Sequence, residues 1–198
     1  IDEKCAVTIF QVRPLAASIK GVRSAIPDDR VFEAADDAMA EYDALCDKLG
    51  EKNTILSDMA FWNPAEIIGI NPHPLDFSLY REIITSGAWN QGLSYIGYKY
   101  VDGDLMYKIG NKPYISLKKS FLGLMPDDID NRLEQKLLRY YNRKLMSDPT
   151  AHDKIEFEIA FSDYDFSTED KLSELSNDEF NGEEITVEFI ITQFAKFV

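Results

Sequence analysis

Hydrophobic residues spaced three and four positions apart predict two long helices in this chain. The first spans 28 to 49, with Asp28 or Asp29 as its cap and Gly50 just past its end. Its acidic positions fall off the apolar stripe, which is typical of a solvated face. The predicted inward positions are Val31, Phe32, Ala35, Ala38, Met39, Tyr42, Leu45, Cys46 and Leu49.

The second long helix is predicted between Pro126 with Asp127-Asp128 and the stop at Asp148-Pro149. Its predicted inward positions are Ile129, Leu133, Leu137, Tyr140 or Tyr141, and Leu145. It is the one basic helix expected in an acidic chain, which suits either a docking face for an acidic domain or a solvated face. We favour the solvated face, because exposed charges are usually balanced by nearby carboxylates. Its basic residues are Arg132, Lys136, Arg139, Arg143 and Lys144.

Between these helices, residues 58 to 98 predict several short elements. Asn63-Pro64-Ala65-Glu66 combines Asn at the N-cap, Pro at the first helical position and Glu at the third. Two prolines in 71–74 predict a turn, and Asp76 is expected to cap the next helix. A third short helix is expected over 88–95 after Gly87. The inward positions of the Asp76 helix are predicted as Phe77, Tyr80, Ile83 and Ile84.

Runs in which inward and outward positions alternate, and runs rich in aromatic residues, predict the strands. They fall at 6–13, 54–60 and 155–161, with a three-strand meander over 98–118 whose turns are Asp102-Gly103 and Gly110-Asn111. Residues 168–175 suggest a short helix, 177–184 a polar loop, and 185–198 fits strand or helix. The predicted fold class is α+β, with two long helices and several short helices packed on a small, mostly antiparallel sheet.

Composition narrows the classes of protein. The 198 residues are 45% hydrophobic, enough for a core, and the net charge is −14. That charge argues against nucleic acid and anionic lipid as partners, and no apolar run reaches the ~18 residues of a membrane span. Cys5 and Cys46 are expected to be reduced thiols in a cytoplasmic protein. The start at Ile1 and the apolar end suggest a piece of a longer polypeptide.

Motifs for self-contained chemistry are missing from the sequence. It has no Gly-rich phosphate loop, CxxC, HExxH or GxSxG, and His73 and His152 are far apart. Glu156 and Glu158 share a predicted strand face, where surface glutamates are common. We therefore expect no complete active site within these residues.

Two polar residues at the end of the first predicted strand are the main chemical candidates. Gln11 and Arg13 alternate onto one face, and Pro14 follows. Arg supplies a planar fork for phosphate and Gln a neutral carbonyl, so the pair suits a metal-bound nucleotide. From spacing alone, a strand that runs out into solvent is the more economical interpretation.

The segment IDEKCAVTIFQVRPL resembles the end of the ATP-grasp nucleotide-binding domain of phosphoenolpyruvate synthases and pyruvate phosphate dikinases. In that family the Gln-x-Arg-Pro motif lies at the ATP phosphates and their Mg, which implies that Gln11 and Arg13 bind the nucleotide and that Gln11 contacts the metal. The WNPAE motif, the SLYREIIT segment, PYISLKKSF and HDKIEFEI resemble a subgroup of these proteins and extend the resemblance over most of the chain.

The resemblance implies residues 1–15 as the terminal strand of an ATP-grasp-like domain, 16–27 as a linker and 28–198 as an α+β intermediate domain. The parent would use ATP and Mg to phosphorylate a histidine outside this chain and then pyruvate or another acceptor. Its partners would be the ATP-grasp half and the phosphohistidine domain, and the fragment would bind no cofactor tightly. The alternative is a noncatalytic ligand-binding or domain-docking module that uses the Trp62/Trp89 region as its surface, with Asn63, Glu66, Arg81 and Trp89 as candidate residues.

Overall fold

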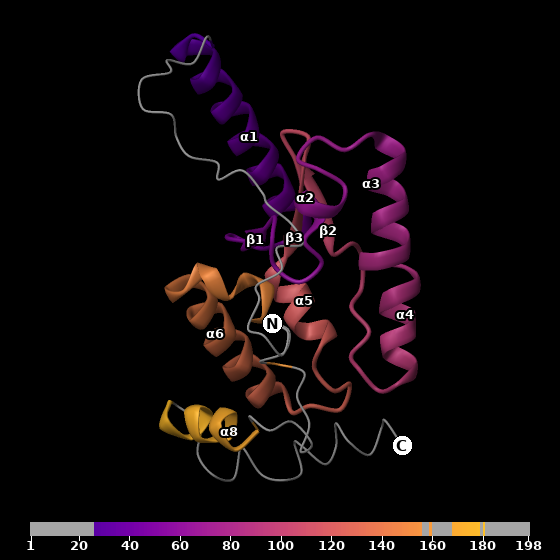
Figure 1. The fold of residues 1–198 in the computed structure, drawn as a ribbon, viewed down its shortest axis with the longest axis vertical. Coiled ribbons are helices and arrows are strands. Elements are labelled where there is room, and N and C mark those ends of the chain that lie inside the picture. The colour runs from indigo at the N-terminus through magenta and orange to yellow at the C-terminus, as the bar shows by residue number, and fades with distance from the viewer. Residues whose placement is uncertain (1–25, 156–158, 160–167, 179, 181–198) are drawn as a thin grey trace, which may run out of the picture. The chain divides into compact units, whose positions relative to one another are not determined.

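The structure, a computed structural model, describes residues 26–155, 159, 168–178 and 180. Residues 36–198 belong to one compact unit, and residues 1–35 form another, of which 26–35 are described. The predicted strand at 6–13, most of the 16–27 linker and the 185–198 segment lie outside the described residues. Within the described part, helices dominate and one small antiparallel sheet is present, which confirms the predicted α+β class (Figure 1).

The sheet consists of three short strands in the order β1-β3-β2, all antiparallel within the described residues. They are β1 (Leu56–Ser57), β2 (Met106–Ile109) and β3 (Lys112–Ser116). Gly110 and Asn111 join β2 to β3 with φ of 52° and 72°. Two consecutive left-handed residues are typical of a type I′ hairpin turn, so the predicted Gly110-Asn111 turn is confirmed.

The predicted three-strand meander over 98–118 is wrong at its first strand. Tyr98 forms an isolated β-bridge with Pro126, and the third strand of the sheet comes from β1 instead. The side chain of Asn90 explains the difference, because its amide binds both backbone groups of Val101. Nδ2 of Asn90 donates to the Val101 carbonyl at 2.8 Å, and the Val101 amide donates to Oδ1 at 3.2 Å. These groups are therefore unavailable to a strand ladder.

The segment before the hairpin folds into short helices, as predicted, and among them the start of α3 differs from the prediction. They are α2 (Pro64–Ile67), α3 (Pro74–Tyr80), the π-helix η1 (Arg81–Thr85) and α4 (Ala88–Tyr95). Helix α3 begins at Pro74 and not after Asp76, because the fixed φ of proline suits the first helical position. Gly87 ends η1 where a Cβ would lie 2.2 Å from the Glu82 carbonyl oxygen, so no larger residue fits there.

Four further helical elements follow or precede the sheet. They are α1 (Asp28–Leu49), α5 (Leu117–Gly123), α6 (Asn131–Ser147) and α8 (Thr168–Asn177), with a 3-10 turn, η2, at Pro149–Asp153. Helix α6 begins later than predicted, because the Asp130 carboxylate accepts from the amides of Arg132 and Leu133 and caps it there. Helix α5 was not predicted from the sequence. None of the described helices is long and apolar enough to cross a membrane.

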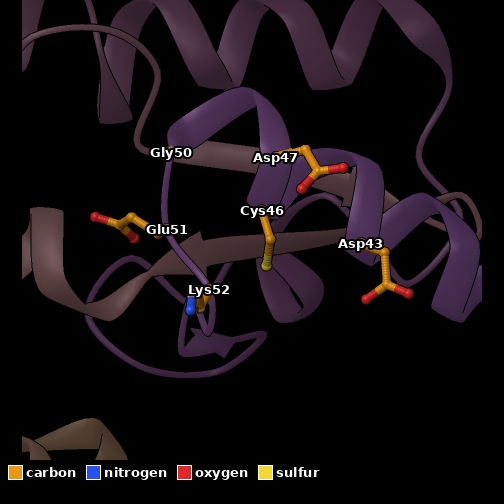
Figure 2. A pocket seen from close by; sticks show the side chains of 6 residues that line it. All are labelled: Asp43, Cys46, Asp47, Gly50, Glu51 and Lys52. Atoms are coloured by element: carbon orange, nitrogen blue, oxygen red, sulfur yellow. The ribbon is translucent and has the colours of Figure 1, made fainter.

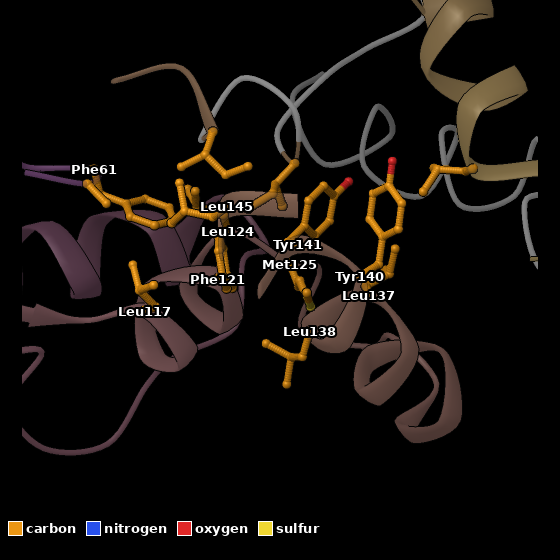
Figure 3. Packing of buried hydrophobic residues seen from close by; sticks show 14 of the residues in the cluster. Phe61, Leu117, Phe121, Leu124, Met125, Leu137, Leu138, Tyr140, Tyr141 and Leu145 are labelled. Carbon is orange, nitrogen blue, oxygen red and sulfur yellow. The ribbon is translucent and has the colours of Figure 1, made fainter. Parts of the chain in front are cut away.

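The core lies mainly between α5 and α6 (Figure 3). Phe121 is fully buried, with its ring centroid 5.2 Å from Phe61 and 5.9 Å from Tyr141. Ile155 and Ile159 are also buried, but both have helical backbone, so the predicted strand at 155–161 is wrong at these two positions. Residues four positions apart lie on one face of a helix, and they also lie on one face of a strand. The alternating pattern alone therefore does not distinguish a helix from a strand at these positions. The intervening Glu156 and Glu158 lie outside the described residues.

Helix α1 confirms the predicted helix but not its predicted inward stripe. Of the nine positions, Cys46 alone is buried within the described residues, and Val31, Phe32 and Met39 are 50, 69 and 58% exposed. Periodicity finds an amphipathic helix, but it does not say how much of the apolar face another element covers.

Candidate functional site

The two residues with the most specific predicted chemistry, Gln11 and Arg13, lie outside the described residues. Their nucleotide and metal assignments stay predictions. The structure does place the four candidate surface residues: Asn63, Glu66, Arg81 and Trp89.

Trp62 is the centre around which part of the predicted surface assembles. Its ring contacts Trp89 of α4 edge to face, with centroids 5.0 Å apart and an interplanar angle of 71°. Tyr80 donates its hydroxyl to the Trp62 carbonyl. Burial raises the pKa of Tyr80 to about 12, so this phenol stays a donor at neutral pH. Because Trp89 is still 44% exposed, the pair presents an aromatic face to solvent.

The backbone on both sides of Trp62 is strained. Phe61 has φ of 62° and Asn63 has φ of 40°, in the left-handed region that non-glycine residues seldom adopt. The Asn63 side chain does not form the predicted cap of α2; its Oδ1 and Trp62 Nε1 are buried without a hydrogen-bond partner among the described residues. Strained backbone and unsatisfied buried polar atoms persist only where the surrounding packing imposes them.

Residues 61–63 form a turn, and the contacts on either side of this turn account for its strained backbone. The Ala65 amide donates to the Asp58 carbonyl at 3.3 Å, and the Asp58 carboxylate pairs with Lys112 of β3. Pro64 and Ala65 are buried. The turn is therefore anchored to the sheet at one end and to the core at the other.

Arg81 and Glu66 have other surroundings. Arg81 Nε lies 3.8 Å from the Asp104 carboxylate, both about 40% exposed, and Glu66 is exposed on α2. Of the four predicted residues, Trp89 contacts Trp62 and Asn63 adjoins it in the chain, whereas Arg81 forms an ion pair with the loop before β2. The Trp62/Trp89 region was predicted as a binding surface, whereas Tyr80 was predicted only as an inward position of its helix.

A separate hollow of about 570 Å³ lies at the end of α1 (Figure 2). Its chemistry was not predicted, because its residues appear in the sequence only as a solvated helix face and a helix stop. Cys46 lies at its centre between Asp43 and Glu51. The lining residues are Asp43, Cys46, Asp47, Gly50, Glu51 and Lys52.

The hollow is lined by charges of both signs. Cys46 is buried there, beside three carboxylates and the Lys52 side chain. The hydrogen bond with Cys46 raises the pKa of Tyr42, and the hydrogen bond from Lys118 lowers the pKa of Glu51. Among the described residues, no three His, Cys, Asp or Glu side chains are grouped so that they could hold a metal ion.

Lys119 is a half-buried charge with a structural role. Its Nζ donates to the carbonyls of Asp102 and Asp104 at 2.9 and 3.0 Å and lies 5.8 Å from the Tyr107 ring centroid. Burial lowers the pKa of Lys119. These contacts fix the loop before β2, which turns at Gly103 with φ of 75°.

Comparison with known proteins identifies no relative. No protein-family model matches the chain, no curated protein matches it, and no solved structure matches it.

Proposed function

We propose that this chain is part of a phosphoenolpyruvate-synthase-like phosphotransferase and that residues 28–198 serve as its intermediate domain. The Gln-x-Arg-Pro motif at 11–14, followed by the WNPAE, SLYREIIT and HDKIEFEI segments in that order, carries the proposal. The described residues of this part form a packed core between α5 and α6, as an independently folded intermediate domain requires.

In this proposal Gln11 and Arg13 belong to the ATP site. A guanidinium group binds phosphate oxygens through two parallel hydrogen bonds, and an amide oxygen is a suitable ligand for Mg²⁺. ATP phosphorylates a histidine outside this chain, in a phosphohistidine domain, and the phosphoryl group then passes to pyruvate or another acceptor. The protein is cytoplasmic, where ATP is supplied.

Titration calorimetry of the 198-residue chain with Mg-ATP tests whether most of the nucleotide site lies outside this chain. We expect no binding tighter than a Kd of roughly 1 mM, because the proposal assigns most of the ATP contacts to the other part of the ATP-grasp domain. Micromolar binding by this chain would contradict the intermediate-domain assignment.

The role of Arg13 is tested in the longer parent protein. We expect Arg13→Ala to reduce ATP-dependent phosphohistidine formation by roughly 100-fold or more, the usual cost of removing a donor to a transferring group. Arg23→Ala, in the linker, is the matched control and should leave the rate unchanged. Equal rates for Arg13→Ala and the unaltered protein would refute the nucleotide assignment.

A noncatalytic binding module is the second candidate, and the half-exposed Trp89 beside Trp62 favours it. In that case the isolated chain binds a small molecule or a domain, and Trp89→Ala abolishes the binding. Tyr95→Ala is the control, since Tyr95 is 90% exposed on the same helix. Binding that survives Trp89→Ala would exclude this surface.

A further inference from the structure

Three apolar side chains of α3 and the π-helix that continues it are exposed to solvent: Leu75 and Leu79 of α3 and Ile83 of η1, here named the α3 stripe. They are 65, 49 and 53% exposed. The sequence analysis predicted Ile83 as an inward residue, and the structure corrects this. The opposite face, with Tyr80, packs against Met106 and Ile115 of the sheet. The stripe is therefore the outer surface of a helix whose inner surface already has its partner.

The helical backbone continues from α3 into the π-helix η1, which carries Ile83. In an α-helix, positions four residues apart drift by about 40° around the axis, because 3.6 residues complete a turn. In η1 the Ser86 amide donates to the Arg81 carbonyl at 2.8 Å, five residues back, so more residues complete the turn. A wider turn rotates the chain less per residue and so opposes this drift. Single π turns of this kind are frequent at functional sites.

The stripe is large enough to serve as an interaction site. Three side chains at these exposures present on the order of 300 Å² of apolar area, which is where an exposed patch begins to indicate an interaction site. Isolated exposed apolar residues need no such explanation. A row of three at four-residue spacing does, because it matches the anchor pattern by which amphipathic helices are bound.

The charges around the stripe are acidic. Asp76 and Glu82 are exposed on the same continuous helix, α4 has no charged residue, and Arg81 faces the Asp104 carboxylate. The whole chain has a net charge of −14. A second copy would therefore bring like charge to the contact, and so would an anionic lipid surface. A partner with basic residues beside an apolar row is electrostatically complementary.

We propose that the α3 stripe is a docking surface for a protein segment that presents an amphipathic helix with Lys or Arg on its flanks. The apolar row of the partner packs on Leu75, Leu79 and Ile83, and its basic flanks lie over Asp76 and Glu82. This surface is distinct from Gln11 and Arg13, and the proposal holds whether or not the chain serves an ATP-dependent enzyme.

The test uses the full 198-residue chain and two fluorescent synthetic helices in anisotropy titrations. Both peptides carry Leu at three- and four-residue spacing; one has Lys flanks and the other has Glu flanks. We expect the Lys peptide to bind and the Glu peptide to bind at least about tenfold more weakly. The double variant Leu79→Ser/Ile83→Ser should weaken binding of the Lys peptide by about tenfold or more, since it removes two anchors.

Matched variants separate docking from general attraction to an acidic protein. Ile67→Ser on α2 and Met146→Ser on α6 remove apolar side chains of similar exposure, 63 and 66%, outside the stripe, and should leave the affinity unchanged. Asp76→Lys should weaken binding of the Lys peptide by about threefold, and less at high salt. Circular dichroism and urea unfolding confirm that each variant keeps its fold.

Other outcomes overturn the proposal. Equal binding of both peptides, or equal loss in the Ile67→Ser control, would show nonspecific adsorption. Concentration-dependent dimerisation that Leu79→Ser abolishes would identify a second copy as the occupant. Peptide binding that is detected only after removal of 185–198 would identify that segment, and Leu79-dependent binding to anionic vesicles would identify a membrane.

Discussion

At the residue scale, two buried serines four positions apart differ in whether their hydroxyl groups form hydrogen bonds. Ser116 and Ser120 are 1 and 3% exposed. The Ser116 hydroxyl accepts from the Lys119 amide and caps α5, whereas Ser120 Oγ is buried with no partner among the described residues. A buried hydroxyl without a hydrogen bond opposes folding, and a capping hydroxyl supports it. The two serines should therefore respond in opposite ways to truncation.

We expect Ser120→Ala to leave the free energy of unfolding unchanged or to raise it slightly, because the substitution removes an unsatisfied polar atom at little cost in volume. Ser116→Ala is the matched control and should lower it by about 1 kcal/mol, the usual value of an N-cap. Urea unfolding followed by circular dichroism measures both. A loss of stability in Ser120→Ala as large as in Ser116→Ala would show that the Ser120 hydroxyl has a partner.

At the element scale, a few side chains connect segments that are distant in sequence. Glu51, just after α1, binds Lys118 of α5 and accepts from the Thr54 hydroxyl at 2.8 Å. Lys99 pairs with Glu134, which is 7% exposed on α6 and also accepts from Gln135 at 3.2 Å. These contacts attach the end of α1 to α5, and the 98–101 segment to α6.

The Glu51 contact predicts a pH dependence. The hydrogen bond from Lys118 holds the pKa of Glu51 below its usual 4.5 in the folded chain. The carboxylate therefore stabilises the fold above that usual value, and the contribution is lost as pH falls through the lowered folded-state pKa. We expect Glu51→Gln to lower the free energy of unfolding by about 0.5 to 1 kcal/mol at pH 7 and by much less near pH 3.

Urea unfolding of the unaltered chain and of Glu51→Gln, at both pH values, measures this difference. Asp37→Asn, at an exposed position on α1, serves as the control and should show no comparable change with pH. A Glu51→Gln effect that is the same at pH 7 and pH 3 would mean that the ionised carboxylate does not stabilise the fold.

At the scale of the whole molecule, stability is concentrated where α5 and α6 meet. Phe121, Met125 and Ile155 are fully buried there, and a smaller cluster around Met106 and Ile115 joins α3 to the sheet. Much of the apolar surface elsewhere is exposed, including the α3 stripe and parts of α1. The packing of the described residues is therefore concentrated in these two clusters, and the larger one lies between α5 and α6.

We expect Phe121→Ala to lower the free energy of unfolding by about 3 to 5 kcal/mol, since it leaves a cavity among Phe61 and Tyr141. Tyr95→Ala, at a position that is 90% exposed, should change it by no more than about 0.5 kcal/mol. Chemical denaturation of both variants checks the contrast. Similar losses in the two would place the stabilising core elsewhere.

The candidate site was predicted only in part, for a physical reason. Sequence pattern marked the segment around Trp62 and Trp89 as a set of short elements, and the edge-to-face contact between the two rings agrees with that emphasis. The pattern did not indicate the left-handed backbone at Phe61 and Asn63. Asn before Pro is a good N-cap in isolation, but anchoring of the turn by the sheet and the core overrides that preference.

The sequence by itself determined the elements that depend on neighbours in the chain. The periodicity of α1 and α6, the α4 helix after Gly87 and the Gly110-Asn111 turn all follow from local steric and capping rules. Only the tertiary structure decided which faces are covered, because burial depends on what packs against an element. Tertiary packing pairs β1 with β3 and lets the Asn90 side chain bind the backbone of Val101. It also leaves Leu75, Leu79 and Ile83 exposed to solvent.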